Sequence, residues 1–145
     1  MLAGLTFHHH GLALNFDGEA LTMLRLLGYS MGEQVHDPVL NVNLRLCVHP
    51  AFPAVEIVLR GSERGPLDAL LRRHDQLLYH SCYEVADREA VLAALEEAGL
   101  RVVPVLPPTP AVLFEGRLVS FHTILGFGLI ELLDQTGPNP IRDGQ

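Results

Sequence analysis

Residues 8–29 read HHHGLALNFDGEALTMLRLLGY, and residues 79–100 read YHSCYEVADREAVLAALEEAGL. Each stretch begins as a strand-like run that carries a histidine, and it continues as an apolar helical pattern that ends at a glycine. In both stretches a histidine stands 19 residues before that glycine. The sequence therefore contains one structural unit twice, and this repeat predicts the fold.

Strand patterns follow both helical runs. Residues 41–48 alternate strictly between polar and apolar, which is typical of a half-buried strand, and further short apolar runs follow in each half. Each half therefore reads βαβββ. We predict an α+β fold in which two paired βαβββ modules form a cup-shaped mixed sheet. The predicted single domain spans residues 1–145 and consists of module 6–60, linker 61–76, module 77–134 and a mobile tail over 135–145.

Four local predictions concern the connections between these elements. A helix is expected over 67–73, and one short strand is expected near 31–36. The run PPTP at 107–110 is expected to break the strand over 100–105, because proline lacks the N–H that a sheet requires. Another short strand is expected at 112–114.

The composition excludes several classes of function. Apolar residues make up 48% of the chain and charged residues 19%, as in an ordinary globular protein. The net charge of −7 disfavours nucleic acid or an anionic membrane as a partner. All ten basic residues are arginine, so the chain has neither a Schiff-base lysine nor a P-loop lysine.

The sequence also bears on location. No apolar run approaches the roughly 18–20 residues that span a bilayer, and the first residues lack the pattern of a signal peptide. Cys47 and Cys82 are expected to be two buried thiols, although a single disulfide also fits the count. We therefore expect a cytoplasmic protein.

One glutamate in each half interrupts an apolar strand. Glu56 and Glu131 both lie between two bulky apolar residues, where a carboxylate is costly unless it is paired or binds a cation. Each half also supplies a histidine, His9 or His80, and the small residue Gly11 leaves room on the face of His9. Imidazole and carboxylate groups suit a divalent metal. These four residues together predict a metal site.

Three further polar residues are candidates for substrate binding. Asn43 and Arg45 share the polar face of strand 41–48, and Arg45 could hold a carboxylate or phosphate group by a bidentate contact. A solvated strand face explains both residues as well, and the two interpretations stay open. His122 is the third candidate.

These residues resemble the vicinal oxygen chelate superfamily, which contains glyoxalases, bleomycin-resistance proteins and extradiol dioxygenases. Three segments carry the resemblance: HHHGLAL at 8–14, YHSCYEVAD at 79–87 and GLIEL at 128–132. The strand VEIV at 55–58 fits the members that are similar to methylmalonyl-CoA epimerase. The likeness covers roughly residues 6–134 and implies a glyoxalase-like fold.

The resemblance implies that His9, Glu56, His80 and Glu131 hold one divalent ion, which is Co, Mn, Ni, Zn or Fe. His9 takes this place rather than its neighbours because it stands two residues before Gly11. The resemblance also implies that Glu131 is one catalytic base and that Glu56 acts on the opposite side of the substrate. Strand 41–47 departs from the epimerase pattern, because it carries no acid where some members offer a further carboxylate.

The implied activity is that of a metal-dependent isomerase or epimerase, which transfers a proton α to a carbonyl through a metal-stabilised enediolate. An acyl-CoA or another acyl thioester is the expected small-molecule substrate. The alternatives are a glyoxalase-type lyase acting on a hemithioacetal and a non-catalytic binding or drug-resistance protein of the same fold, with iron-dependent ring cleavage as a third. A homodimer is expected, and either one chain or two chains that exchange modules can complete the cup.

Overall fold

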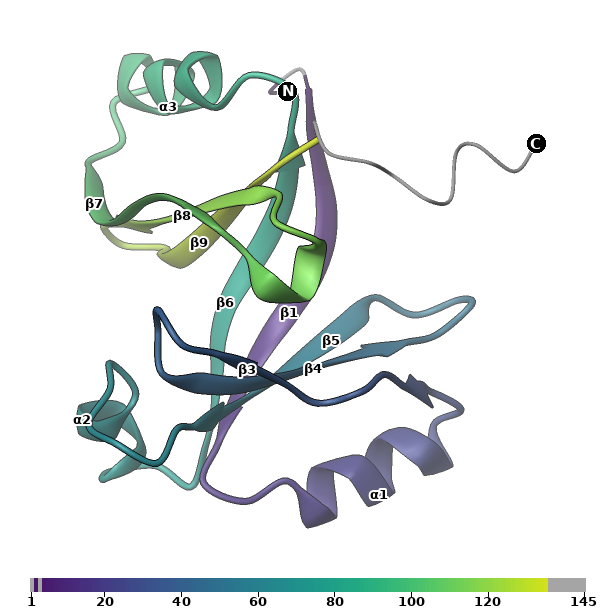
Figure 1. Cartoon of the computed structure of the whole chain (residues 1–145). Helices are drawn as coiled ribbons and strands as arrows, with labels where there is room; N and C mark the ends of the chain where they lie inside the picture. Colours follow the sequence, from purple (N-terminus) through teal and green to yellow (C-terminus); the bar gives the residue numbers. More distant parts are fainter. Residues whose placement is uncertain (1, 3, 136–145) are drawn as a thin grey trace. The chain divides into compact units, whose positions relative to one another are not determined.

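Two compact units make up the computed structural model, which describes residues 2 and 4–135 (Figure 1). The N-terminal unit is His8–Ser81, and the C-terminal unit combines Met1–Phe7 with Cys82–Gln145. The chain passes between the units inside two long strands, β1 (Leu5–Leu14) and β6 (Gln76–Val85). As a result, both histidines of the repeat belong to the N-terminal unit.

The N-terminal unit is a mixed sheet with one main helix. Its strands follow the order β2-β4-β5-β1-β6, and β3 also pairs with β4. Strands β1 and β5 run parallel, whereas β4 is antiparallel to β2, β3 and β5. The elements between β1 and β6 are α1 (Gly18–Leu26), β2 (Ser30–Met31), β3 (Val35–Asp37), β4 (Val42–Val48), β5 (Ala54–Arg60) and the short α2 (Asp68–Leu71).

Helix α1 ends where the sequence predicts. Gly28 has a φ of +92°, a left-handed conformation that glycine adopts readily, and the N–H of Tyr29 donates to the carbonyl of Leu24 at 3.0 Å. One buried cluster of the unit consists of Leu14, Leu24, Cys47 and Ile57. Because these residues come from β1, α1, β4 and β5, helix α1 covers one face of the sheet and leaves the other face to different side chains.

The C-terminal unit repeats this plan. Its strands follow the order β6-β9-β8-β7, with β7, β8 and β9 antiparallel. Helix α3 (Arg88–Glu97) begins at Asp87, whose carboxylate accepts a hydrogen bond from the N–H of Ala90 at 3.0 Å, and it stops before Gly99. The other elements are β7 (Val102–Pro110), the 3-10 turn η1 (Val112–Phe114), β8 (Leu118–Ile124) and β9 (Gly128–Asp134). One buried cluster of this unit contains Val85, Val91, Ile124, Ile130 and Leu132.

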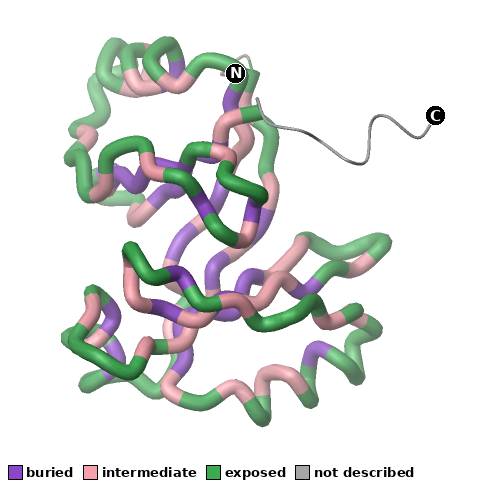
Figure 2. Tube along the Cα trace, viewed as in Figure 1, coloured by how far each residue is buried: buried purple, intermediate pink, exposed green. Residues whose placement is uncertain are grey.

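The α+β architecture is confirmed; the second half has the βαβββ order, and the first half has this order with its second strand divided into β2 and β3. In each unit the buried residues lie mainly on the strands, and the helices present mostly exposed residues (Figure 2). The helix expected over 67–73 is present as the shorter α2. The predicted tail begins at residue 135, and residues 136–145 lie outside the described part of the chain. No helix of the described residues combines the length and the apolar character that a membrane span requires.

Three local predictions are wrong. The prolines of 107–110 lie within β7 and do not break it, because β7 stands at the end of the strand order, where a missing N–H is tolerated and the register can shift. Residues 112–114 form a 3-10 turn instead of a strand, and Glu115 follows it with a φ of +55°. The single strand expected near 31–36 is two short strands, β2 and β3.

Candidate metal centre

The register of β1 and β5 brings a histidine and a carboxylate to one face of the N-terminal sheet. Gly11 lies beside Glu56, and His9 lies beside Ala54. Partners in register point to the same side, as do residues two apart on one strand. Since Ile57 belongs to the core under α1, His9 and Glu56 project from the face away from that helix.

Three predicted ligands meet on this face. His9 Nε2 lies 3.2 Å from His80 Nε2 and 3.4 Å from Glu56 Oε2. His80 Nε2 lies 3.8 Å from Glu56 Oε1. All three side chains are buried, and His9 is 0% exposed. Nitrogen and oxygen atoms gathered in this way are costly to bury unless they share a proton or a cation.

The distances between these atoms fit a shared metal ion. Two ligand atoms that each lie about 2.1 Å from one ion, at tetrahedral or octahedral angles, are about 3.0–3.4 Å apart. The two distances from His9 Nε2 lie in this range, and the distance from His80 to Glu56 exceeds it by a few tenths of an ångström. Two imidazoles and a carboxylate also bind Zn, Fe, Co, Mn and Ni. The residues therefore fit one divalent ion.

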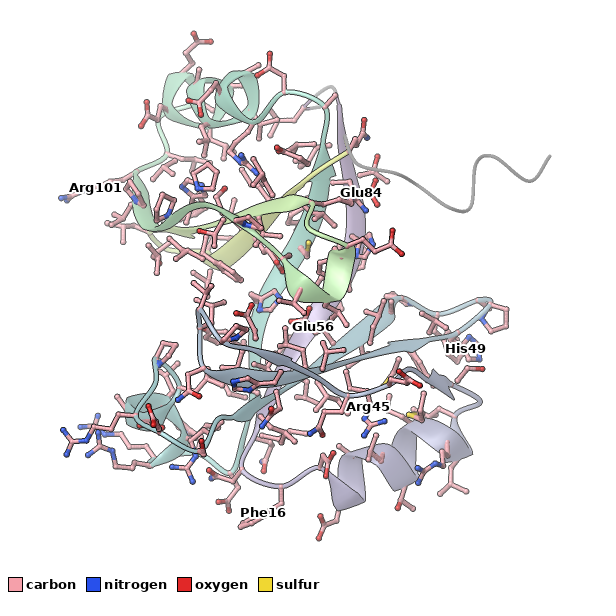
Figure 3. All side chains as sticks on the ribbon, in the orientation of Figure 1. Phe16, Arg45, His49, Glu56, Glu84 and Arg101 are labelled. Atoms are coloured by element: carbon pink, nitrogen blue, oxygen red, sulfur yellow. The ribbon has the colours of Figure 1, made fainter. Side chains whose placement is uncertain are left out.

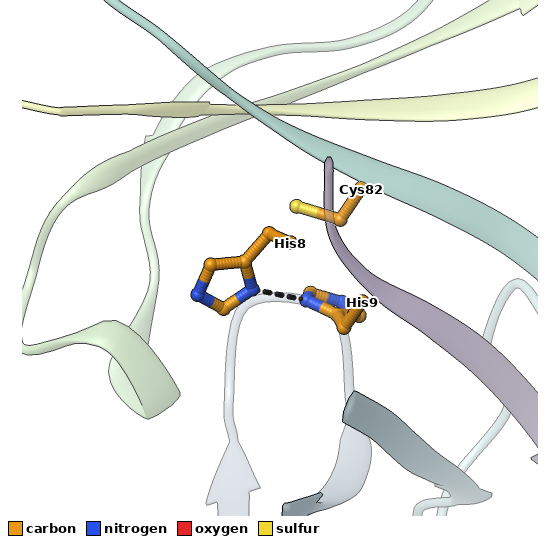
Figure 4. A group of neighbouring side chains, drawn as sticks. All are labelled: His8, His9 and Cys82. Atoms are coloured by element: carbon orange, nitrogen blue, oxygen red, sulfur yellow. Dashed lines mark hydrogen bonds between the residues drawn. The ribbon is translucent and has the colours of Figure 1, made fainter. Parts of the chain in front are cut away.

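The second ring nitrogen of His9 has a partner of its own. His8 Nδ1 lies 2.7 Å from His9 Nδ1, and the two rings are inclined at 78° (Figure 4). One of these nitrogens donates and the other accepts, because two lone pairs at this distance repel. His9 is thus engaged through Nδ1 with His8 and through Nε2 with Glu56 and His80.

Gly11 makes room for His80. A Cβ atom built on Gly11 would overlap the His80 ring and would lie 2.7 Å from its Nε2. Real Cβ atoms essentially never approach another atom this closely. The absence of a side chain at Gly11 therefore lets the His80 ring lie against β1, beside Glu56 in the neighbouring strand.

Glu131, the fourth predicted ligand, lies on β9 of the C-terminal unit and is 3% exposed. It stands opposite Phe121, whereas its neighbours Ile130 and Leu132 point into the core under α3. Glu56 has the same surroundings in its own unit: it is buried, on the last strand of the first βαβββ module, and on the face away from the helix. The repeat therefore extends from the sequence to the orientation of the carboxylate.

Asn43 and Arg45 lie on the face of β4 that is opposite to the face shared with Glu56. Register pairs Arg45 with Ile57, so its side chain points toward α1, and Glu56 points away from that helix (Figure 3). Arg45 Nη1 donates to the carbonyl of Gly32 at 2.8 Å. Asn43 shares the face of Arg45. Substrate binding by Asn43 and Arg45 stays a prediction, and the register gives it no support.

His122, like Arg45, lies on the opposite face of its sheet from the buried glutamate, which is Glu131 in this unit. It pairs with Ile130, on the α3 side of the sheet, and its Nε2 lies 2.9 Å from Ser120 Oγ. Burial lowers the pKa of His122 below its ordinary value of 6.5, and the charge of Arg88 lowers it further. His122 is therefore neutral near pH 7 and does not share the face of Glu131, so its role in substrate binding stays a prediction.

The sequence profile of the Glyoxalase/Bleomycin resistance protein/Dioxygenase superfamily matches residues 8–121. The chain belongs to this superfamily. The match confirms both the resemblance recognised in the sequence and the glyoxalase-like fold. A comparison with functionally curated proteins finds no match.

Solved structures share the superfamily fold at low sequence identity. Methylmalonyl-CoA epimerase from Mycobacterium tuberculosis has a TM-score of 0.71 and 16% identity, over 94% of this chain and 93% of that one. A variant of Streptomyces coelicolor methylmalonyl-CoA epimerase in complex with 2-nitronate-propionyl-CoA has a TM-score of 0.73 and 15% identity, over 93% and 100%. A hypothetical protein from Bacillus halodurans C-125 has a TM-score of 0.73 and 17% identity, over 92% and 96%. At such identities the likeness shows the fold alone.

Two features of this superfamily member escape the sequence analysis. Leu46 pairs with Glu56, so the apolar side of β4 faces the same way as the carboxylate. The sequence indicates this pairing through the turn centred on Ala51, because residues equally distant from a hairpin turn pair with each other. The contact of His8 with His9 depends on ring orientation, for which the sequence carries no signal.

Proposed function

We propose that the protein is a metal-dependent isomerase of the epimerase type, which moves a proton at the carbon next to a carbonyl group. The observation that carries the proposal is the convergence of His9 Nε2, His80 Nε2 and the Glu56 carboxylate, with separations of 3.2 to 3.8 Å. Burying three such groups costs folding free energy. A bound cation accounts for this cost, and a simple receptor has no need of it.

Glu131 is the proposed fourth ligand. It is buried on the last strand of the second βαβββ module, as Glu56 is on the last strand of the first module. Two carboxylates and two neutral imidazoles balance the charge of a divalent ion. A site with only one carboxylate would leave a net positive charge buried, which is costly. A divalent ion held there would supply positive charge where negative charge develops on the substrate oxygen as the α-proton leaves.

The two carboxylates are also the proposed proton carriers. An epimerase needs one group that removes the α-proton and a second group that returns a proton to the opposite side. We assign removal on one side to Glu131 and the complementary role to Glu56. His9 and His80 serve as neutral ligands that hold the site in place and take no part in the proton transfer.

The proposed substrate is an acyl thioester such as an acyl-CoA. On the face of Glu56, strand β4 presents Leu44 and Leu46, and Val58 lies opposite Leu44. A wall of this kind suits an acyl chain and excludes water from the reacting carbon. The Streptomyces coelicolor epimerase, which binds 2-nitronate-propionyl-CoA, supports the same substrate class.

A glyoxalase-type lyase acting on a hemithioacetal is the second candidate. The same set of ligands would serve that reaction, which also moves a proton next to a carbonyl. The observation that favours it is the composition of β4. The side chains of β4 on the same face as Glu56 include leucines and no further acid. Conversion of a hemithioacetal without exchange of the α-proton of acyl thioesters would select this alternative.

The first experiment is the metal content per chain, by elemental analysis of protein purified without an affinity tag and reconstituted with Co, Mn, Ni, Zn and Fe(II). The wild-type chain should hold close to one ion, and Glu131→Gln should hold distinctly less. Glu96→Gln, the same change at an exposed position of α3, should match the wild type. Metal-loaded protein should then catalyse deuterium exchange at the α-carbon of an acyl-CoA. A wild-type chain that retains none of the five metals would contradict the proposal and leave a binding protein.

A further inference from the structure

We propose that His8 is a positioning residue, which fixes the protonation pattern of the His9 ring and aims the Nε2 lone pair of His9 at the metal site. The inference rests on the proposed metal-dependent function. His8 and His9 are adjacent in β1, yet their rings turn toward each other, with 2.7 Å between the Nδ1 atoms. His9 is fully buried, whereas His8 is partly exposed.

The positions of the ring protons follow from this geometry. A neutral imidazole has one N–H and one lone pair. His9 can bind a metal through Nε2 only if that nitrogen keeps its lone pair, so the proton must sit on Nδ1. The Nδ1–H group then donates to the Nδ1 lone pair of His8, and the proton of His8 sits on its other nitrogen, Nε2.

This contact also fixes the direction of the ring. An N–H bond lies in the plane of its imidazole, so a hydrogen bond from Nδ1 holds the plane and leaves Nε2 pointing at Glu56 Oε2 and His80 Nε2, 3.4 and 3.2 Å away. Metal-bound histidines usually donate their other N–H to a carboxylate or a backbone carbonyl, and the partner strengthens and orients the ligand. In this chain a second imidazole serves that purpose.

The test separates hydrogen bonding from packing. His8→Phe keeps a ring and removes the acceptor, whereas His8→Asn places an amide oxygen near the former position of Nδ1. His74→Phe is the matched control, at an exposed histidine of the same unit. Long-range 1H–15N NMR of the metal-free proteins shows which nitrogen of His9 carries the proton. Competition with a chelator measures the Zn2+ affinity, and a urea titration confirms that each variant folds.

In the wild type and in His8→Asn, the His9 proton should sit on Nδ1, and the two Zn2+ affinities should agree within about threefold. In His8→Phe the proton should move toward Nε2, and the affinity should fall by about 10- to 100-fold, as is typical when the partner of a metal-bound histidine is lost. His74→Phe should match the wild type.

Three results would overturn the assignment of His8 while leaving the proposed function intact. These are a wild-type His9 that carries its proton on Nε2, an unchanged Zn2+ affinity in His8→Phe, and equal losses in His8→Phe and His8→Asn. Failure of the wild type to bind any of the metals would instead reject the proposed function, and the role of His8 with it.

Discussion

The N-terminal and C-terminal units each place a helix after their first strand and several antiparallel strands after that helix, and their sheet faces away from the helix each carry a buried glutamate. Glu56 on β5 and Glu131 on β9 are both buried on that face. On the helix side, Cys47 in one unit corresponds to His122 in the other, because each lies opposite the residue that precedes the glutamate. The repeat keeps the carboxylate and varies the helix side, as the function proposed for the carboxylate face requires.

The histidines of the repeat are divided unequally. Because β1 and β6 each run from one unit into the other, His9 and His80 both belong to the N-terminal unit. That unit therefore contains three of the four predicted ligands, and the C-terminal unit contains only Glu131. We expect the N-terminal unit to dominate metal affinity and Glu131 to matter more for proton transfer.

Loss of a histidine ligand has the largest expected effect. His9→Gln or His80→Gln should lower the Zn2+ affinity by more than about 100-fold. Loss of a hydrogen-bond partner of a metal ligand usually costs about 10- to 100-fold, and loss of the ligand itself should cost more. Deuterium exchange at the α-carbon should fall with it. Chelator competition measures the affinity, and His74→Gln at an exposed position provides the matched control.

Glu131→Gln sharpens the comparison between the units. The three converging ligands of the N-terminal unit all remain in this variant, whereas a histidine variant breaks that set. Its loss of Zn2+ affinity should therefore be smaller than that of either histidine variant, while its α-proton exchange should fall at least as far. Chelator competition and deuterium exchange on the same preparations separate these effects. An affinity loss equal to that of His9→Gln would show that the two units contribute equally to binding.

Gly11→Ala is expected to have the next largest effect. The added methyl group would occupy the space of the His80 ring, which cannot shift without moving Nε2 away from Glu56. A misplacement of about 1 Å typically costs up to 100-fold at a functional site, so we expect a 10- to 100-fold loss of Zn2+ affinity. Gly18→Ala is the control, since a Cβ there meets no atom within 4 Å. Equal affinity in the two variants would contradict the packing argument.

Most of the fold is predictable from the sequence because its signals are local. The helical runs end at Gly28 and Gly99, whose φ angles are +92° and +86°, and the alternation at 42–48 is a strand. The errors arise where tertiary position overrides local preference. Residues 107–110 contain three prolines, and only the place of β7 at the end of the strand order allows them to remain in a strand.

The site is predictable to a different degree. His9, Glu56 and His80 do converge, and the repeat alone was sufficient to select them. For β4 the sequence leaves two interpretations of Asn43 and Arg45 open, and the register places Leu46 on the face of Glu56. The position of the hairpin turn in the sequence determines this register. To decide which face of β4 belongs to the site, the position of α1 must also be known.

Substitutions on the two faces of β4 test that conclusion. Leu46→Ala removes apolar surface beside Glu56 and should raise the KM for an acyl-CoA by about fivefold. Arg45→Met removes the hydrogen bond to Gly32 and should lower the free energy of unfolding by about 1 kcal/mol, with an unchanged KM. Steady-state exchange kinetics and urea titrations give both quantities. A tenfold higher KM in Arg45→Met would instead support the role in substrate binding predicted from the sequence.

The smallest expected effect concerns the buried groups on the helix sides, Cys47 and His122. Burial raises the pKa of the Cys47 thiol above its ordinary value of 9.0, although the charges of Arg45 and Arg25 partly oppose this. Burial lowers the pKa of His122 below 6.5. Both groups are therefore neutral in the folded protein near pH 7, and the unfolded chain ionises each of them more readily than the folded protein does.

The two units should consequently lose stability at opposite ends of the pH range. Below pH 6.5 the unfolded chain takes up a proton at His122 before the folded protein does, so stability falls as the pH falls. Above pH 9.0 the unfolded chain releases the Cys47 proton first, so stability falls as the pH rises. Urea titrations from pH 5 to 10 should show that His122→Phe flattens only the acid side and Cys47→Ala only the alkaline side. If His122→Phe leaves the acid side unchanged, the neutral state of His122 makes no measurable contribution, and the helix sides differ in sequence without differing in their response to pH.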